Sequence, residues 1–319
     1  MGETYTAAGT IRLVGALAGV GSGLTKVAVG HGFDTIKTRM QCSPPGTYAG
    51  AIDVLKKLIQ HEGVSALYKG ATPPAVAWAA IDSVLLGSLY NYRLILRRHG
   101  MTEPTPEKGV ERLSLLGHGI AGLGAGLTSA LVATPVELLK VNLQLQSQRS
   151  SLDRQFKGPV DCIRQVVRAQ GIRGLWTGST GSFIVRGNMF WMFMSFEAFM
   201  RGFSALEGTQ YEISTGLSNF LSGGLASFVF WAFAIPADNV KNRMMSQPLL
   251  SSIGPRDRST RLPRRSFLSI ARDIHAEEGV RGFLRGLGPT FLRAFPSNAS
   301  ALFVYEGILN GLGAEKTRH

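Results

Sequence analysis

Three short segments of the sequence place an acidic side chain and a lysine at the same spacing. The acid follows a Pro or Gly by two residues and the lysine follows the acid by three, which gives Asp34 with Lys37, Glu137 with Lys140, and Asp238 with Lys241. A proline inside a helix kinks it and redirects the chain, and a glycine also permits a bend. We therefore expect each acid to pair with the lysine of a neighbouring segment, so that three ion pairs close a ring.

The same spacing indicates that the chain is built from repeats. Asp34, Glu137 and Asp238 lie 103 and then 101 residues apart. A second landmark, a short aromatic and apolar run that ends in Gly70, Gly178 or Gly286, recurs at intervals of 108 residues. Self-similarity at a fixed period is the signature of a repeated structural unit. The predicted repeats cover residues 8–103, 108–206 and 213–313.

Other chemistries have no comparable pattern in the sequence. It contains no paired His and Cys ligand set for a metal, no Walker loop and no nucleophile elbow. Two cysteines, Cys42 and Cys162, are too few for a disulfide framework and are interpreted as free thiols. We therefore expect no enzymatic activity, no metal and no cofactor.

The composition favours a membrane protein with a polar interior. Apolar residues make up 45% of the chain, and the mean hydropathy is only +0.10. Residues 113–131 and 217–235 nevertheless contain no charged side chain apart from His118, and both runs are long enough to cross hydrocarbon. Helices that line a water-filled cavity keep one polar face, which lowers the mean hydropathy. The net charge of +13 comes without a nucleic-acid motif, so an anionic lipid surface is the expected partner.

The tripled Pro-x-acid-x-x-base motif resembles the signature of the mitochondrial carrier family of inner-membrane solute transporters. The resemblance implies an all-α membrane protein with six transmembrane helices in three pseudo-threefold repeats and three short matrix-side surface helices. It also implies a monomer that works by alternating access. The N-terminal residues 1–12 show neither a secretory nor a transit pattern, which suits import by internal signals.

The resemblance also implies two gates. On the matrix side, Asp34 pairs with Lys140, Glu137 with Lys241 and Asp238 with Lys37, and two glutamines support the pairs, Gln41 and Gln144. On the cytoplasmic side the expected pattern is incomplete, and the candidate residues are Arg93, Glu197, Arg201 and Glu306.

Glycines mark the predicted lipid sites. A surface helix is expected at residues 51–59, and the first spanning helix at about 10–42. By resemblance, helix N-termini present backbone N–H groups to cardiolipin phosphates at Gly50, Gly70, Gly158, Gly178 and Gly286. The third repeat has Ser266-Phe267-Leu268 in place of one such glycine, and residues 246–265 read as a solvated loop.

The substrate site is expected at one level on the three even-numbered helices. Seven residues after each landmark glycine stand the pairs Ala77-Trp78, Val185-Arg186 and Arg293-Ala294. Arg293 begins a run, which includes Asn298, that resembles the amino-acid and acylcarnitine branches of the family. Arg186 either faces the cavity or packs against Glu197 or a backbone carbonyl, and Asp82 either faces the cavity or balances Lys26.

The charge balance of this site predicts the substrate class. Two arginines against one aspartate leave the cavity positive, which favours an anionic di- or tricarboxylate of the citrate or aconitate type, moved by antiport. The alternatives are an amino-acid or acylcarnitine carrier and, from another class, a membrane scaffold that does not transport. Basic amino-acid carriers would need an acid beside Arg186, where this chain has Gly187.

Overall fold

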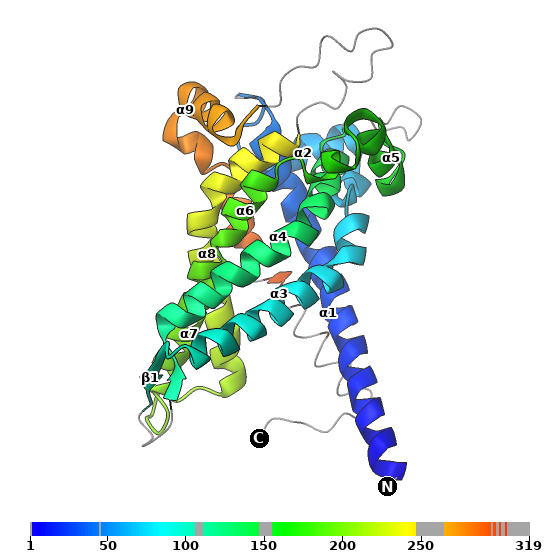
Figure 1. The fold of residues 1–319 in the computed structure, drawn as a ribbon. Coiled ribbons are helices and arrows are strands. Elements are labelled where there is room, and N and C mark those ends of the chain that lie inside the picture. The colour runs from blue at the N-terminus through cyan, green and yellow to red at the C-terminus, as the bar shows by residue number, and fades with distance from the viewer. Residues whose placement is uncertain are drawn as a thin grey trace.

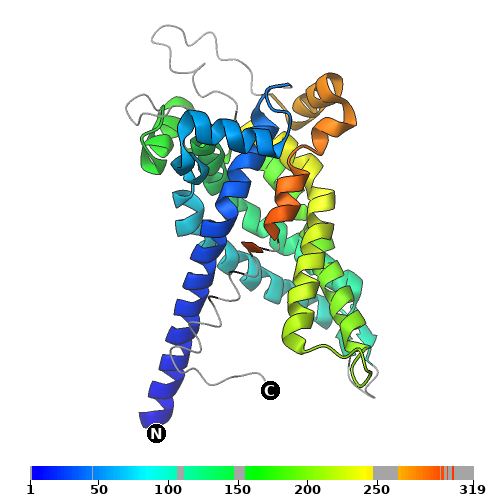
Figure 2. The ribbon, with the colours of Figure 1, turned by 180° about the vertical axis from the view of Figure 1, so that it is seen from behind.

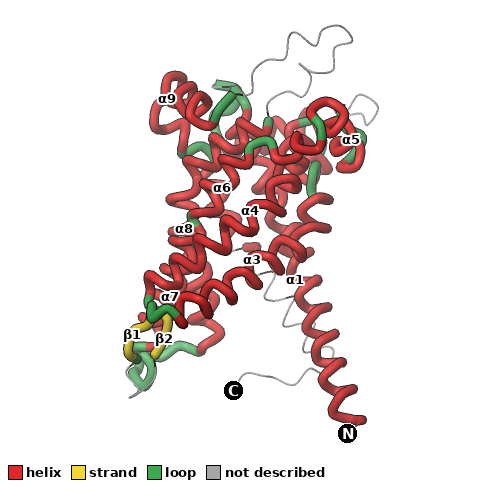
Figure 3. The backbone as a smooth tube through the Cα atoms, viewed as in Figure 1, coloured by secondary structure: helices red, strands yellow, loops and turns green. Residues whose placement is uncertain are grey.

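The fold is a bundle of long helices, as Figure 3 shows. A computed structural model describes residues 2–44, 46–105, 111–146, 155–246 and 265–294, together with residues 296, 297, 300 and 304. The long helices are α1 (Gly2–Cys42), α3 (Thr72–Arg98), α4 (Leu115–Leu145), α8 (Thr215–Met245), and α6 (Ser179–Gly187) followed by α7 (Met189–Ser204). Residues 287–294 are also helical. The all-α prediction is confirmed, although α1 begins at Gly2 rather than near residue 10.

Two of these helices contain the uncharged runs of the sequence. Within the described residues, α4 and α8 are the two helices whose length and composition suit a membrane span. Each begins at a serine that caps the first turn: the Ser114 hydroxyl accepts from the Gly117 amide at 3.0 Å, and the Ser214 hydroxyl accepts from the Leu217 amide at 3.4 Å. Each continues past a proline in its second half, Pro135 or Pro236. The acid–base segments therefore lie on helices rather than in loops.

The helix of the second repeat that carries Arg186 is broken just after it. Helix α6 ends at Gly187 and α7 begins at Met189, with Asn188 between them at φ −69° and ψ −2°. The break coincides with a close approach of α4, because a Cβ on Gly126 would lie 2.1 Å from the carbonyl oxygen of Arg186. Only a glycine on α4 admits the backbone of the break at this distance.

Three short helices gather at one end of the bundle (Figures 1 and 2). They are α2 (Ala51–Glu62), α5 (Pro159–Gln170) and α9 (Phe267–Phe283), and 3-10 turns follow the first two, η1 (Val64–Tyr68) and η2 (Ile172–Trp176). Each buries apolar residues one turn apart: Val54 and Leu58, Cys162 and Val166, Ile270 and Ile274. They are the surface helices that the sequence predicts, and we call this end the surface-helix end.

A small β-hairpin, which the sequence analysis did not predict, lies at the opposite end (Figure 1). Strands β1 (Thr102–Pro104) and β2 (Glu111–Leu113) pair antiparallel, with Thr102 opposite Leu113. The hairpin joins the last helix of the first repeat to the first helix of the second. We call this end the hairpin end. Both cysteines are free, as expected.

Candidate functional site

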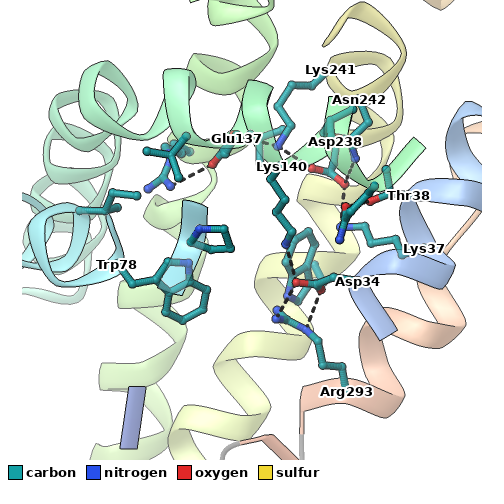
Figure 4. Close-up of a pocket in the computed structure, with 18 of the residues that line it drawn as sticks. Asp34, Lys37, Thr38, Trp78, Glu137, Lys140, Asp238, Lys241, Asn242 and Arg293 are labelled. Carbon is teal, nitrogen blue, oxygen red and sulfur yellow. Dashed lines mark hydrogen bonds and ion pairs between the residues drawn. The ribbon is translucent and has the colours of Figure 1, made fainter. Parts of the chain in front are cut away.

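A cavity of about 270 Å³ lies between the long helices. Its wall is formed by side chains from α1, α3, α4, α6, α7 and α8 and by Arg293 of the helical segment 287–294. The lining combines charged groups with two tryptophans, Trp78 and Trp231. Figure 4 shows that Trp78 projects from one side and that Asp34 and Arg293 lie on the other.

The three acids and three lysines of the repeated motif meet at the surface-helix end of this cavity. Lys140 Nζ lies 2.5 Å from Asp34 Oδ2, Lys241 Nζ lies 3.0 Å from Glu137 Oε2, and Lys37 Nζ lies 2.7 Å from Asp238 Oδ2. Each pair joins two different repeats, and these are the partners expected from the sequence. Lys241 also bridges to Asp238 Oδ1 at 2.9 Å, so it links two of the pairs. We call these six residues the charge ring.

Two arginines extend the charge ring into the cavity. Arg293 Nε lies 3.3 Å from Asp34 Oδ1, so Asp34 is held between Arg293 and Lys140 (Figure 4). A guanidinium nitrogen of Arg186 lies 3.0 Å from Glu137 Oε1, and the other donates to the Ser129 hydroxyl at 3.1 Å. Arg186 thus lines the cavity and pairs with Glu137 rather than with Glu197, which was the alternative. Five basic side chains share three carboxylates in this network.

The two supporting glutamines have different contacts. Gln41 donates to Asp238 Oδ2 at 3.3 Å and accepts from Asn242, which itself donates to Asp238 at 3.1 Å. Gln144 is also fully buried, but it donates to the Thr35 hydroxyl at 3.2 Å and accepts from Thr38 at 2.9 Å. Only Gln41 therefore contacts a carboxylate of the charge ring.

The sequence analysis missed two groups that also hold the ring. One is Asn242, whose position four residues after Asp238 places it on the same face of α8. The other is Trp231, because Lys37 Nζ lies 4.0 Å above the centroid of its ring. The spacing of Asn242 was a usable signal, whereas the contact of Trp231 with Lys37 depends on the packing of α1 against α8.

The remaining predicted substrate residues lie on or behind the cavity wall. Trp78 and Asp82 line the cavity from α3, but in the described part of the chain Ala77 is not part of its wall. Of the predicted pair Ala77-Trp78, it is therefore Trp78 that reaches the cavity. Val185 also reaches the wall while it packs against α8 residues, among them Phe230. Asn298 lies outside the described residues.

The five glycines of the predicted lipid sites have two different backbone conformations. Gly70, Gly178 and Gly286 have φ values of +76°, +83° and +83°, which other residues adopt only with strain. A Cβ at Gly70 would lie 2.9 Å from the carbonyl oxygen of Lys140, so the next repeat packs closely there. Gly50 and Gly158 are instead extended N-caps of α2 and α5, and a Cβ at either would meet nothing within 4 Å. Open space therefore faces these two helix N-termini.

Two groups on the surface helices have shifted pKa values. Lys57 donates to Asp53 at 2.8 Å, and this hydrogen bond, with a second from the Ala49 amide, lowers the pKa of the Asp53 carboxyl. Burial of Cys162 on the inner face of α5 raises the pKa of its thiol to about 12. The Cys162 thiol is therefore neutral and structural at physiological pH.

The predicted residues of the second gate form a different kind of cluster. At the hairpin end, Arg201 pairs with Glu197 on its own helix at 2.9 Å, with Glu103 of β1, and with the carbonyl oxygen of Leu113 at 2.8 Å. Arg112 also pairs with Glu103, at 3.0 Å, and we call Glu103, Arg112, Glu197 and Arg201 the hairpin cluster. Arg93 instead lies 5.7 Å from the centroid of the Phe193 ring, and Glu306 lies outside the described residues.

Comparison with known proteins identifies the family. Residues 13–100, 111–206 and 214–316 each match the family described as Mitochondrial carrier protein. The chain is 34% identical over 314 residues to the mitochondrial carnitine/acylcarnitine carrier-like protein of Arabidopsis thaliana, with 93% of this chain and 97% of that protein covered. It is 32% identical over 303 residues to mitochondrial substrate carrier family protein S of Dictyostelium discoideum, with coverage of 93% and 96%.

A third relative is the mitochondrial basic amino acids transporter of Bos taurus, which is 30% identical over 306 residues, with 95% of this chain and 93% of that protein covered. The matches extend across all three repeats, and so does the charge ring. The chain therefore belongs to the mitochondrial carrier family and is a solute transporter of the inner mitochondrial membrane.

Proposed function

We propose that this transporter moves a small solute with one carboxylate, of the amino-acid or acylcarnitine class, by alternating access. The observation that carries the proposal is the network in which five bases, Lys37, Lys140, Lys241, Arg186 and Arg293, share three acids, Asp34, Glu137 and Asp238. Two positive charges in this network lack a counter-charge of their own. A carboxylate that enters the cavity would supply one.

Arg293 and Arg186 are the proposed binding groups for that carboxylate. Both guanidinium groups line the cavity, and a guanidinium presents its donors in a fork that matches a carboxylate. Arg293 already contacts Asp34 through two nitrogens, at 3.3 and 3.5 Å, so its fork is turned toward a carboxylate in this structure. A substrate carboxylate would share or replace that contact.

The same contact couples binding to opening of the charge ring, which acts as the matrix gate in this proposal. A carboxylate bound at Arg293 competes with Asp34 for the same guanidinium group, so it weakens one of the two contacts that hold Asp34 in the closed ring. Asp34 is then held by Lys140 alone, and the two residues separate more easily. A ligand shifts a conformational equilibrium only through such a difference in interaction between the two states.

The charge count favours one carboxylate over two or three. Asp82 adds a fourth acid to the cavity wall, so the described lining side chains have a net charge of about +1. A tricarboxylate would exceed this by two charges, whereas a monocarboxylate would balance it. The names of the carnitine/acylcarnitine and basic amino acid relatives agree with this class. We therefore prefer it to the di- or tricarboxylate first predicted from the sequence.

Uptake into liposomes tests the proposal with a series that contains neutral and basic amino acids, carnitine, an acylcarnitine, succinate and citrate. We expect uptake of single-carboxylate zwitterions and a loss of at least roughly thirtyfold in Arg293→Ala, because a desolvated carboxylate would lose its partner. Arg293→Lys should restore only part of the uptake, since an ammonium lacks the fork. Arg281→Ala, at an exposed arginine of α9, is the matched control. Preferential uptake of citrate would contradict the proposal, and no uptake of any solute would favour a scaffold.

We also propose that cardiolipin binds at the surface-helix end and that the transporter is a monomer that exchanges solutes. The support for the lipid sites is the pair of helix N-termini at Gly50 and Gly158, whose surroundings are open and whose unpaired N–H groups suit a phosphate. In the third repeat the Ser266 hydroxyl takes the place of a phosphate oxygen, since it accepts a hydrogen bond from the Ser269 amide at 3.2 Å. Two of the three surface helices therefore have the stronger lipid sites.

A further inference from the structure

We infer that Asp82 and Trp78 bind the cationic nitrogen of the solute, on the wall of the cavity opposite Arg293. This inference rests on the proposed function, because it assigns the second charge of a zwitterion to named side chains. Among the charged side chains that line the cavity, Asp82 differs from the others in its contacts. Within the described part of the chain, each of the other eight charged lining residues takes part in an ion pair, whereas Asp82 has neither an ion pair nor a hydrogen bond to its carboxylate.

An unpaired carboxylate on a transmembrane helix is costly and usually faces a pathway or a partner. Asp82 is exposed and is one of the residues that line the cavity. Lys26 of α1 is one candidate for a permanent counter-charge, but it forms no ion pair with Asp82 and lines a small adjoining cavity with Trp78 and Arg293. Asp82 is thus left available to a ligand.

Trp78 completes a site for a cation. It lies four residues before Asp82 on α3, so the two side chains share one face of the helix, and both line the cavity. The face of a tryptophan ring attracts ammonium and quaternary ammonium groups. Trp231 across the cavity already has such a cation, Lys37 at 4.0 Å, whereas Trp78 has none among the described residues. Figure 4 shows the Trp78 ring directed into the space between the helices.

Asp82 can also take the place of the acid that is absent beside Arg186. The sequence analysis required an acid next to this arginine for a cationic amino acid, and the chain has Gly187 there. Gly187 is the last residue of α6, and a Cβ there would lie 3.5 Å from the Leu123 side chain. In this chain the acid comes from α3 instead. Carboxylate and cation therefore bind to different walls, which sets the orientation of the solute across the cavity.

The test compares carnitine with its carbon isostere, 3-hydroxy-5,5-dimethylhexanoate, in which a tert-butyl group replaces the trimethylammonium group. The two have the same shape and the same carboxylate, and only carnitine carries the cation. Inhibition of uptake of a transported radiolabelled zwitterion gives the ratio of their affinities. We expect the wild type to prefer carnitine by roughly tenfold or more, as a charge-assisted contact predicts. In Asp82→Asn the ratio should fall to about one while the isostere binds as before.

Three controls separate the possible outcomes. Asp82→Glu should keep the preference for carnitine, and Trp78→Phe should keep part of it. Lys26→Gln should leave the ratio unchanged. If the ratio is unchanged in Asp82→Asn, or is lost equally in Lys26→Gln, the inference is overturned and Asp82 serves helix packing. A wild type that takes up citrate but binds neither carnitine nor its isostere would overturn the proposed function, and the inference with it. Thermal melting of each detergent-purified variant shows whether a loss reflects unfolding.

Discussion

The two ends of the bundle use the same residue types in different arrangements. At the surface-helix end, each ion pair of the charge ring joins two repeats, as Lys140 does when it reaches Asp34 from α4 to α1. At the hairpin end, Arg201 pairs with Glu197 four residues before it and with Glu103 of the connecting hairpin. The first arrangement must break if the three repeats separate at that end. The ion pairs of Arg201 hold the connecting hairpin to α7, so a separation of the repeats does not have to break them.

This difference shows that an acid and a base in contact do not by themselves make a gate. What matters is whether the pair bridges the elements that move. The two clusters overlap in burial, but the most buried acid of the charge ring, Asp238, has a side chain that is 3% exposed, whereas that of Glu103 in the hairpin cluster is 32% exposed. Loss of one partner from a buried pair leaves a desolvated charge, which costs about 3–5 kcal/mol, whereas exposed pairs contribute about 1 kcal/mol or less.

Charge reversal in the ring is therefore expected to have the largest effect on transport. Asp34→Lys and Lys140→Glu should each abolish transport in liposomes, because each places like charges in contact. The two substitutions combined should restore part of the activity, since the ion pair is re-formed with its ends exchanged. Recovery should be incomplete, because Arg293 would then face a lysine at position 34. Normal transport by either single variant would show that the ring is not the matrix gate.

A smaller effect is expected at the hairpin end. Arg201→Ala removes contacts to Glu197, Glu103 and the Leu113 carbonyl, so it should lower the free energy of unfolding by about 1–3 kcal/mol. The rate of uptake per folded protein should stay within severalfold of the wild-type rate, at a temperature below the melting temperature of the variant. Arg112→Ala is the matched control, because it removes only the more exposed contact to Glu103. A complete loss of uptake in Arg201→Ala would place this residue in a gate.

A third prediction compares a glycine from each end. Gly158→Ala should reduce the rise in melting temperature that added cardiolipin produces, because a methyl group would enter the open space before α5. A tenfold loss of lipid affinity corresponds to about 1.4 kcal/mol. Gly202→Ala on α7 at the hairpin end, where a Cβ also meets nothing within 4 Å, should leave the cardiolipin response unchanged. Equal responses in the two variants would remove Gly158 from the lipid site.

The smallest effect concerns Cys162 at the surface-helix end. Its thiol pKa is raised from 9.0 to about 12, which lowers the thiolate fraction at pH 8 by roughly a thousandfold. We expect maleimide to leave Cys162 unmodified at pH 8 in a Cys42→Ser background, both in the wild-type ring and in Asp34→Lys. Because the folded pKa is the raised one, the stabilising contribution of the neutral thiol is intact below pH 9 and is lost as pH rises toward about 12. Rapid labelling only in Asp34→Lys would show that ring opening loosens α5.

The sequence by itself determined the repeats and the partners of the charge ring. Asp34, Glu137 and Asp238 recur at a fixed period with a lysine three residues on, so each repeat presents the same local arrangement and pairs between neighbouring repeats are expected. The resemblance to the carrier family implied that each acid pairs with the lysine of the next repeat. The contacts Lys140 to Asp34, Lys241 to Glu137 and Lys37 to Asp238 are those expected. The uncharged runs and the surface helices also follow from local patterns, because periodicity and capping act within a few residues.

Only the tertiary structure decided how the non-repeated residues are used. Arg186 and Arg293 reach the acids of the ring because their side chains are long. The acid that Arg186 meets depends on how α6 packs on α4, and the acid that Arg293 meets depends on how residues 287–294 pack on α1. The break after Gly187, the level of Trp78 rather than Ala77 and the contact of Arg201 with the hairpin have the same origin. Each depends on contacts between segments far apart in the chain, and such contacts leave no periodic signal in the sequence.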